Sequence, residues 1–252
     1  MRFASLGSGS RGNATLVEHG SSRVLIDCGF PAAQAERRLG CLGRCAGELT
    51  AIVVTHEHGD HLRGVARLSR RHRLPVWATA GTAVFLRQSV HLLHRFNALE
   101  GFAVGDLEVH PFAVPHDARE PTQFVIGDGA RRLGILTDTG MATAHIAQML
   151  TGCDALILEC NHDPELLAAG PYPPALQARV GGSHGHLSNG QAADLLARLD
   201  RSHLRHLVAA HLSERNNRPG YARAALAAVL GCTPGWIAVA DQEDGLDWRD
   251  LS

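Results

Sequence analysis

The stretch THEHGDH, residues 55 to 61, places three histidines and two acids within seven positions. It follows directly on the apolar run Ala51-Ile52-Val53-Val54, whose composition predicts a buried strand. Strand ends are where α/β folds usually build their sites. The polar cluster is therefore a candidate metal-ligating segment at the end of a strand.

Three later apolar runs are followed by the same kind of side chain, a histidine or an aspartate that can ligate a metal. The runs and the side chains that follow them are 109–114 with His116, 133–136 with Asp138, and 207–210 with His211. Because all of these runs predict strands, we expect their ends to converge at one edge of the sheet structure.

The spacing within THEHGDH provides two sets of ligands. His56 and His58 are two residues apart in an extended segment, so both can face one ion. After Gly59 turns the chain, Asp60 and His61 can face a second ion. Two divalent ions ~3.5–4 Å apart, bridged by a carboxylate and a hydroxide, form a hydrolytic centre in which the hydroxide is the nucleophile. The alternative is a purely structural role, but imidazoles and carboxylates buried without partners are costly.

The bulk composition sets limits on the function. The 252 residues are 45% hydrophobic and 19% charged, and we expect one domain over residues 1–252. The net charge of −1 means that a nucleic-acid partner must be held by a local basic patch. No stretch approaches 18 apolar residues and the N-terminus lacks a long apolar core, so we expect a cytoplasmic protein with no membrane partner. The six scattered cysteines predict free thiols. The oligomeric state is left open.

Short strands and helices alternate along the chain, which indicates an α/β fold. The expected strands are 13–18, 22–27, 51–54, 76–78, 107–114, 122–126, 132–137, 155–158, 207–210 and 236–240. The expected helices are 32–39, 62–72, 191–199 and 221–230. A Gly-Asp-Gly turn at 127–129 separates the expected strands 122–126 and 132–137. This turn, together with the consecutive strands at the start and in the middle of the chain, predicts substantial antiparallel sheet.

With these motifs the chain resembles the metallo-β-lactamase-fold hydrolases. The metal motif H-x-H-x-D-H of that family matches THEHGDH, and an early strand-end aspartate of the family matches Asp27 in LIDCG. The resemblance implies a four-layer αββα sandwich with the site at one edge of the two sheets. The ligand sets that it implies are His56, His58 and His116 for the first ion, Asp60, His61 and His211 for the second, and Asp138 as a bridge. It also implies that Asp27 orients a ligand, whereas its alternative role is that of a strand-terminating turn acid. Since cysteine is absent from this set, two ions of Mn²⁺, Zn²⁺ or Fe²⁺ would all suit it.

Further motifs resemble the YycJ-like branch of this family, which comprises cytoplasmic bacterial 5′-to-3′ exodeoxyribonucleases. These motifs are SLGSGSRGN at 5–13, VPHDA at 114–118, ECNHD at 159–163, GHLSN at 185–189 and AHLSERNN at 210–217.

Several residues in these motifs are candidates for substrate contact. Ser8, Ser10 and Asn13 lie in a Ser/Gly-rich loop that could cradle a terminal 5′-phosphate or form only a glycine turn between strands. Ser188 is a further phosphate candidate, although it also begins a capping-box pattern. His186, in a Gly-flanked loop, is expected to contact phosphate or to act as leaving-group acid, and its alternative is a structural imidazole.

The assignments of four residues complete the expected site. Catalytic roles fall to Asp60 and His186, while Asn161 and His162 are expected to support the metal ligands from behind.

We expect a dinuclear metal-dependent phosphodiesterase that removes nucleotides from a DNA 5′ end. The alternatives are a thioester or lactone hydrolase of the glyoxalase-II type and a non-catalytic, metal-dependent DNA-binding protein. The low aromatic content of 5% favours a short grip on a strand end over a long base-stacking track.

Overall fold

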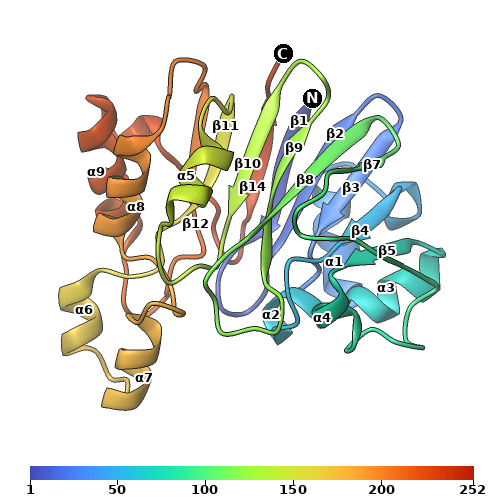
Figure 1. The fold of residues 1–252 in the computed structure, drawn as a ribbon, viewed down its shortest axis with the longest axis horizontal. Coiled ribbons are helices and arrows are strands. Elements are labelled where there is room, and N and C mark those ends of the chain that lie inside the picture. The colour runs from blue at the N-terminus through green and yellow to red at the C-terminus, as the bar shows by residue number, and fades with distance from the viewer.

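The computed structural model describes residues 1–252 as two β-sheets that face each other, with helices on both outer faces (Figure 1). The first sheet has the strand order β14-β1-β2-β3-β4-β5-β6. Its strands are β1 (Arg2–Gly7), β2 (Ala14–His19), β3 (Ser22–Ile26), β4 (Ala51–Val53), β5 (Pro75–Ala78), β6 (Leu92–Arg95) and β14 (Leu246–Asp250).

The second sheet has the order β13-β12-β11-β10-β9-β8-β7. Its strands are β7 (Phe102–Val104), β8 (Leu107–Ala113), β9 (Thr122–Gly127), β10 (Arg132–Leu136), β11 (Ala155–Glu159), β12 (His206–Ala210) and β13 (Ala238–Val239). The helices are α1 (Ala32–Cys41), α2 (Gly59–Leu62), α3 (Val65–His72), α4 (Ala80–Ala83), α5 (Ala144–Leu150), α6 (Pro164–Ala169), α7 (Pro174–Val180), α8 (Asn189–Arg198) and α9 (Pro219–Leu230), with 3₁₀ turns at Ala46–Glu48 and Pro234–Trp236.

The alternation of side chains along the strands builds the layers. In β3, Val24 and Ile26 point into the core between the sheets, whereas Leu25 points outward under the helices. In β11, Ile157 points into the same central core and Leu158 points to the opposite helix layer. Because both faces of each sheet are covered, the strands read as continuous apolar runs. This arrangement confirms the predicted αββα sandwich.

Each helix layer buries its own apolar face. The helices α1 and α3 cover the first sheet through residues that include Leu39 and Leu68. The helices α5, α8 and α9 cover the second sheet through residues that include Ile146, Leu195 and Leu226. None of the helices is long and apolar enough to cross a membrane, and all six cysteines are free.

Strand direction brings the polar strand ends to one edge. The strands β3 and β4 are parallel, as are β10, β11 and β12. Since β8 and β10 are both antiparallel to β9, they also run in the same direction. The two sheets are joined at this edge, where the Thr122 backbone N–H donates to the Thr55 carbonyl oxygen at 3.1 Å.

Two predicted elements differ from the structure. The helix expected at 62–72 begins only at Val65 as α3, because Leu62 ends the separate helix α2 and Gly64 lies between them. A Cβ atom at Gly64 would lie 2.1 Å from the Phe30 carbonyl oxygen. The strand expected at 236–240 is wrong at its start, because Pro234–Trp236 forms a 3₁₀ turn and only Ala238–Val239 pairs with β12.

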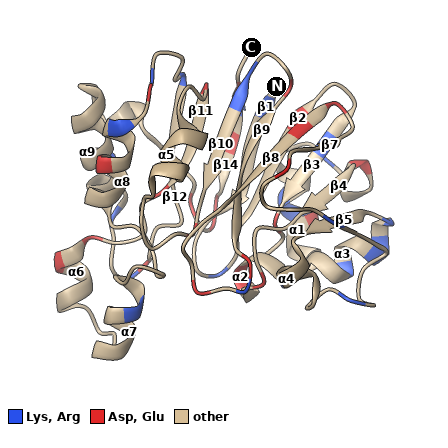
Figure 2. Cartoon of the chain, viewed as in Figure 1, with Lys and Arg blue, Asp and Glu red and all other residues tan.

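Charged residues of both signs are distributed over the outer elements (Figure 2). One cluster of charged residues, centred on the buried Glu18, connects the strands β1, β2 and β14. Glu18 on β2 is 7% exposed and pairs across the sheet with Arg2 of β1. It accepts hydrogen bonds from Arg2 Nη2 at 2.8 Å and from Arg44 Nε at 2.6 Å. Arg2 also stacks on Trp248 of β14 at 4.0 Å. Burial opposes ionisation of Glu18, but the hydrogen bonds from Arg44 and Arg2 outweigh it and lower the pKa of the carboxyl group.

We expect Glu18→Gln to lower the free energy of unfolding at pH 7 by about 2 kcal/mol, because it removes charge-assisted hydrogen bonds. The lowered pKa in the folded state means that this stabilisation is present above the unfolded-state value of about 4.3 and is lost as pH falls through the folded-state value. Urea unfolding at pH 7 and near pH 3 measures the difference. The exposed Glu100→Gln variant is the control, and an equal loss at both pH values would contradict the prediction.

Candidate metal centre

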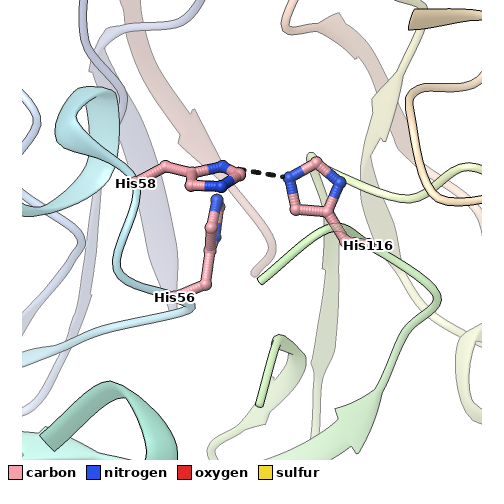
Figure 3. A group of neighbouring side chains, drawn as sticks. All are labelled: His56, His58 and His116. Carbon is pink, nitrogen blue, oxygen red and sulfur yellow. Dashed lines mark hydrogen bonds between the residues drawn. The ribbon is translucent and has the colours of Figure 1, made fainter. Parts of the chain in front are cut away.

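Three histidines form one potential ligand group. His56 and His58 follow β4, and His116 follows β8. Their ring centroids lie 4.6 Å (His56–His58), 4.9 Å (His56–His116) and 5.0 Å (His58–His116) apart. Figure 3 shows the three rings turned toward one another, with His58 Nδ1 3.2 Å from His116 Nε2. One ring nitrogen from each residue can therefore reach a single ion.

A second potential ligand group comprises Asp60, His61 and His211. Asp60 and His61 stand in the first turn of α2, and His211 follows β12. Asp60 Oδ2 lies 3.6 Å from His61 Nε2 and 3.5 Å from His211 Nε2. The three side chains thus converge on one point beside the first group.

Asp138 lies between the two groups. It follows β10 and is 2% exposed. Its Oδ2 is 3.0 Å from His61 Nε2, and its Oδ1 is 3.9 Å from His116 Nε2. The carboxylate also belongs to a group with His56 and His61 whose ligand atoms lie within 4.8 Å of one another. One carboxylate is thereby within reach of both ligand sets.

The donor atoms fit divalent metal ions. His56 Nε2, Asp138 Oδ2 and His211 Nε2 are buried and have no hydrogen-bond partner. Unpaired buried polar atoms are rare and costly, so their presence within these adjoining ligand groups indicates that cations satisfy them. Histidine nitrogens and carboxylate oxygens are the ligands that Zn²⁺, Mn²⁺ and Fe²⁺ accept.

The electrostatics match this interpretation. Burial opposes the charged form of His61, but the carboxylates of Asp138 and Asp27 outweigh it and hold the pKa of His61 well above its ordinary value. In the same way, burial opposes the charged form of His211, but the Asp138 carboxylate outweighs it and raises the pKa of His211 to about 10. At His56, burial and the charge of His61 outweigh the opposing effect of Asp138 and hold the pKa well below the ordinary value. Protons and metal ions therefore compete for the same acidic cluster.

Asp27 and Thr55 orient two of the histidines. Asp27 Oδ2 lies 2.7 Å from His61 Nδ1, and its two oxygens accept hydrogen bonds from the Thr55 N–H and hydroxyl, both at 2.8 Å. The Thr55 hydroxyl oxygen is also 3.0 Å from His56 Nδ1. Asp27 has a left-handed backbone with φ 62°, which asparagine and aspartate tolerate best among residues other than glycine. Thr55 was not among the predicted site residues.

Glu159 is the main site residue that the sequence reasoning missed. It is the last residue of β11 and is fully buried. Its Oε1 lies 2.8 Å from His186 Nδ1 and 3.2 Å from His211 Nδ1. Its Oε2 accepts hydrogen bonds from the Thr139 and Leu187 backbone N–H groups. The signal was present, because Glu159 is an acid that ends an apolar run, as in the other strands of the site.

The predicted supporting residues divide between two places. The Asn161 amide donates to the His211 carbonyl oxygen at 3.0 Å, so it holds the backbone of a candidate ligand. His162 and Ser188 line a different cavity, and their backbones form a β-bridge. The Ser188 hydroxyl accepts the Gln191 N–H as the N-cap of α8. The structure does not bring His162 or Ser188 to the metal ligands, and a phosphate role for Ser188 stays a prediction.

The Ser/Gly-rich loop packs directly behind the ligands. Ser8 is buried, donates to Asn13 Oδ1 at 3.0 Å and accepts the His211 backbone N–H at 2.9 Å. Asn13 Nδ2 lies 3.1 Å from His61 Nε2. Ser10 is exposed and lines the cavity in front of the ligands. Within this loop, only Ser10 combines an exposed hydroxyl with a place in the cavity wall, and the phosphate role of Ser8 and Asn13 stays a prediction.

The cavity itself has a volume of about 350 Å³. One wall carries potential metal ligands together with His186. The facing wall is formed by Tyr172, Leu176, Arg179 and Val180. A molecule in this cavity would contact both the metal ligands and the segment around α7.

Comparison with known proteins identifies the family. Residues 22–212 match the family described as "Beta-lactamase superfamily domain". The chain is 32% identical to exodeoxyribonuclease YycJ of Bacillus anthracis over 238 residues, which cover 91% of this chain and 89% of the relative. It is 30% identical to exodeoxyribonuclease WalJ of Streptococcus pneumoniae over 223 residues, which cover 86% of this chain and 83% of the relative.

A solved structure agrees on the fold. The metallo-β-lactamase-fold protein YhfI from Bacillus subtilis superposes on the chain with a TM-score of 0.76 at 17% identity, covering 99% of each chain. The chain therefore belongs to the Beta-lactamase superfamily and is a metal-dependent hydrolase with the metallo-β-lactamase fold.

Proposed function

We propose that the chain is a dinuclear metal-dependent exodeoxyribonuclease that removes nucleotides from the 5′ end of DNA. The observation that carries the proposal is the position of Asp138, whose buried carboxylate is within reach of both ligand groups at the floor of an open cavity. Two relatives that the chain matches over most of its length are named exodeoxyribonucleases, which supports DNA as substrate.

His56, His58 and His116 would hold one ion, and Asp60, His61 and His211 the other, with Asp138 shared between them. Mn²⁺, Zn²⁺ and Fe²⁺ all suit this set. When bound, two such ions activate a water molecule and offset the negative charge that builds up on a phosphate under attack. The chain contributes the fixed positions of the ligands, since Asp27, Thr55 and Glu159 hold the histidine rings from behind.

The surroundings of His186 support a role as proton donor to the leaving group. Its Nδ1 is held by Glu159 at 2.8 Å, and the side chain lines the cavity with 22% of its surface exposed. With Nδ1 fixed in this way, Nε2 is the nitrogen available to a substrate. We assign His186 as the donor of a proton to the departing 3′ oxygen, and Ser10 as the loop hydroxyl closest to a terminal phosphate.

We expect 3′-labelled, single-stranded DNA with a 5′-phosphate to be shortened stepwise in the presence of Mn²⁺. The variants His58→Ala and Asp60→Ala remove one ligand from each group, so each is expected to reduce the rate by more than ~100-fold, beyond the usual effect of losing an outer partner. His110→Ala, which changes a half-exposed histidine of β8 outside the cavity, is the control.

Comparing 5′-phosphate with 5′-hydroxyl ends in the same assay tests the direction. Failure of the metal-loaded protein to cleave either substrate would refute the proposal. Turnover of a short acyl thioester would then indicate the alternative hydrolase, and metal-dependent DNA retention without cleavage would indicate a binding protein.

The number of ions is tested by Asp138→Asn. The wild type is expected to bind two ions per chain by mass spectrometry of the metal content, and the variant one or none, because the shared ligand is weakened. Removal of the metal ions with a chelator should also lower the Tm of the wild type by several degrees. An ion at 100 times its Kd stabilises by ~2.7 kcal/mol, and each kcal/mol is worth roughly 2–4 °C for a chain of this size. A wild-type content of one ion, unchanged in the variant, would rule out the shared carboxylate.

The role of His186 is tested by the quality of the leaving group. His186→Ala is expected to slow DNA cleavage by ~10²-fold or more, since DNA releases a poor leaving group that needs a proton. The same variant should retain most of its activity on bis(p-nitrophenyl) phosphate, whose leaving group departs without protonation. Equal losses on both substrates, at full metal content, would assign His186 to a structural or phosphate-binding role instead.

A further inference from the structure

The segment Tyr172–Val180 lines the cavity opposite the metal ligands. None of its residues belongs to a ligand group, so metal binding does not explain this segment. The helix α7 carries no buried residue, so its side chains are not consumed by core packing. Figure 1 places α6 and α7 together beyond the ends of the sheets, at the lower left of the view. The half-buried side chains of Leu176 and Val180, four residues apart on α7, line the cavity together with Tyr172, which precedes the helix.

The wall is fixed to the metal site by its own backbone. The His186 backbone N–H donates to the Val180 carbonyl oxygen at 2.9 Å. The next carbonyl toward the site, that of Gly185, lies 3.0 Å from His116 Nδ1. A Cβ atom at Gly185 would meet the Arg179 carbonyl oxygen at 2.2 Å, so this close approach requires glycine. The wall is therefore held at a set distance from the first ligand group.

Arg179 offers free hydrogen-bond donors beside that group. Its Nε donates to Asp117 Oδ2 at 2.6 Å, and Asp117 Oδ1 lies 3.5 Å from His116 Nε2. The Arg179 side chain is 63% exposed, and neither Nη atom has a protein partner. A guanidinium with both Nη groups free is suited to paired hydrogen bonds to a phosphate. Arg179 is the only basic residue of α7, and it accounts for the blue part of that helix in Figure 2.

Tyr172 provides the aromatic surface of the wall. The chain has only two tyrosines, and the other one, Tyr221, lies on α9 away from the cavity. Tyr172 stands in Pro171-Tyr172-Pro173-Pro174, where the prolines restrict the backbone. A rigid, half-buried ring at the rim of a cavity suits stacking on a flat base. A volume of about 350 Å³ suits one nucleotide unit and no long stacking track.

We propose that Tyr172–Val180 is the nucleotide-binding wall of the site, in which Tyr172 stacks on the 5′-terminal base and Arg179 binds a phosphate of the strand. The inference rests on the proposed DNA substrate and names the part of it that the protein grips. Asp117 acts as a positioning residue, because it holds the guanidinium between the wall and the His116 ligand.

The test compares two 5′-phosphorylated oligonucleotides, one normal and one with an abasic 5′-terminal nucleotide. Tyr172→Ala is expected to raise KM for the normal strand about 10-fold with little change in kcat, and Tyr172→Phe should retain the wild-type value because stacking uses the ring. The abasic strand should raise the wild-type KM by a similar factor, and Tyr172→Ala should add less than about twofold to it, since the two changes remove the same contact.

Arg179 is tested through salt. Arg179→Ala should raise KM and reduce the slope of log KM against log salt by about one, the change expected for one lost phosphate contact. Tyr221→Ala and the exposed Arg37→Ala are matched controls and should match the wild type. Bis(p-nitrophenyl) phosphate turnover and metal content of each variant report on the metal centre separately.

The outcomes separate the two proposals. Normal DNA cleavage with an unchanged KM in both Tyr172→Ala and Arg179→Ala would overturn the nucleotide-binding wall and leave the nuclease intact. An equal loss for Tyr172→Ala on normal and abasic strands would overturn the stacking contact. If the wild type hydrolyses bis(p-nitrophenyl) phosphate but cuts no DNA, the proposed function fails first and the wall with it.

Discussion

The carboxylate of Asp138 is the charge around which the site is built. It is almost fully buried, and nitrogens of His61, His211 and His186 lie within 3.4 Å of its oxygens. Burial raises the pKa of a carboxyl group, but the charges of His211 and His61 outweigh this effect and hold the pKa of Asp138 well below its usual range. Without a central anion, several imidazoles and their cations would repel one another in a low-dielectric interior. The position of Asp138 thus allows two groups of ligands, each drawn from both sheets, to share one site.

Strand direction explains how such distant residues meet. The ligands come from loops after β4, β8, β10 and β12, and their only common feature is that each follows a strand that runs toward the same edge. Two of the four non-glycine residues with a left-handed backbone also lie at this edge. Asp27 and His211 are non-glycine residues with left-handed backbones, at φ 62° and 54°, and both belong to the site. Such conformations persist where the surroundings fix them. Here the Thr55 N–H donates to the Asp27 carboxylate, and the His211 backbone N–H donates to the Ser8 hydroxyl oxygen.

Most of the fold and the metal ligands could be predicted from the sequence because they follow local rules. Apolar runs predicted the buried strands, and the residues after these runs predicted the ligands. Glu159 obeys the same rule but was missed, since one acid after a strand carries no spacing pattern of its own. Four strands were missed. The strands β6 and β7 have only four and three residues, which give too little alternation to recognise. The sequences of β1 (RFASLG) and β14 (LDWRD) contain no continuous apolar run. The division between α2 and α3 depends on the approach of Phe30, and the wall at Tyr172 depends on where α7 lies. Both depend on tertiary contacts, which the periodicity of the sequence does not predict.

The strand order of the first sheet also bears on how the chain folds. The strands β1, β2 and β3 are consecutive and can pair early as a meander, but β1 gains its outer neighbour only from β14, where Arg2 lies opposite Asp250. Closing a contact over almost the whole chain has a large loop-entropy cost and slows folding. Until β14 arrives, β1 is an open edge with unpaired backbone groups, which can recruit a strand from another molecule. The last strand therefore protects the sheet from aggregation.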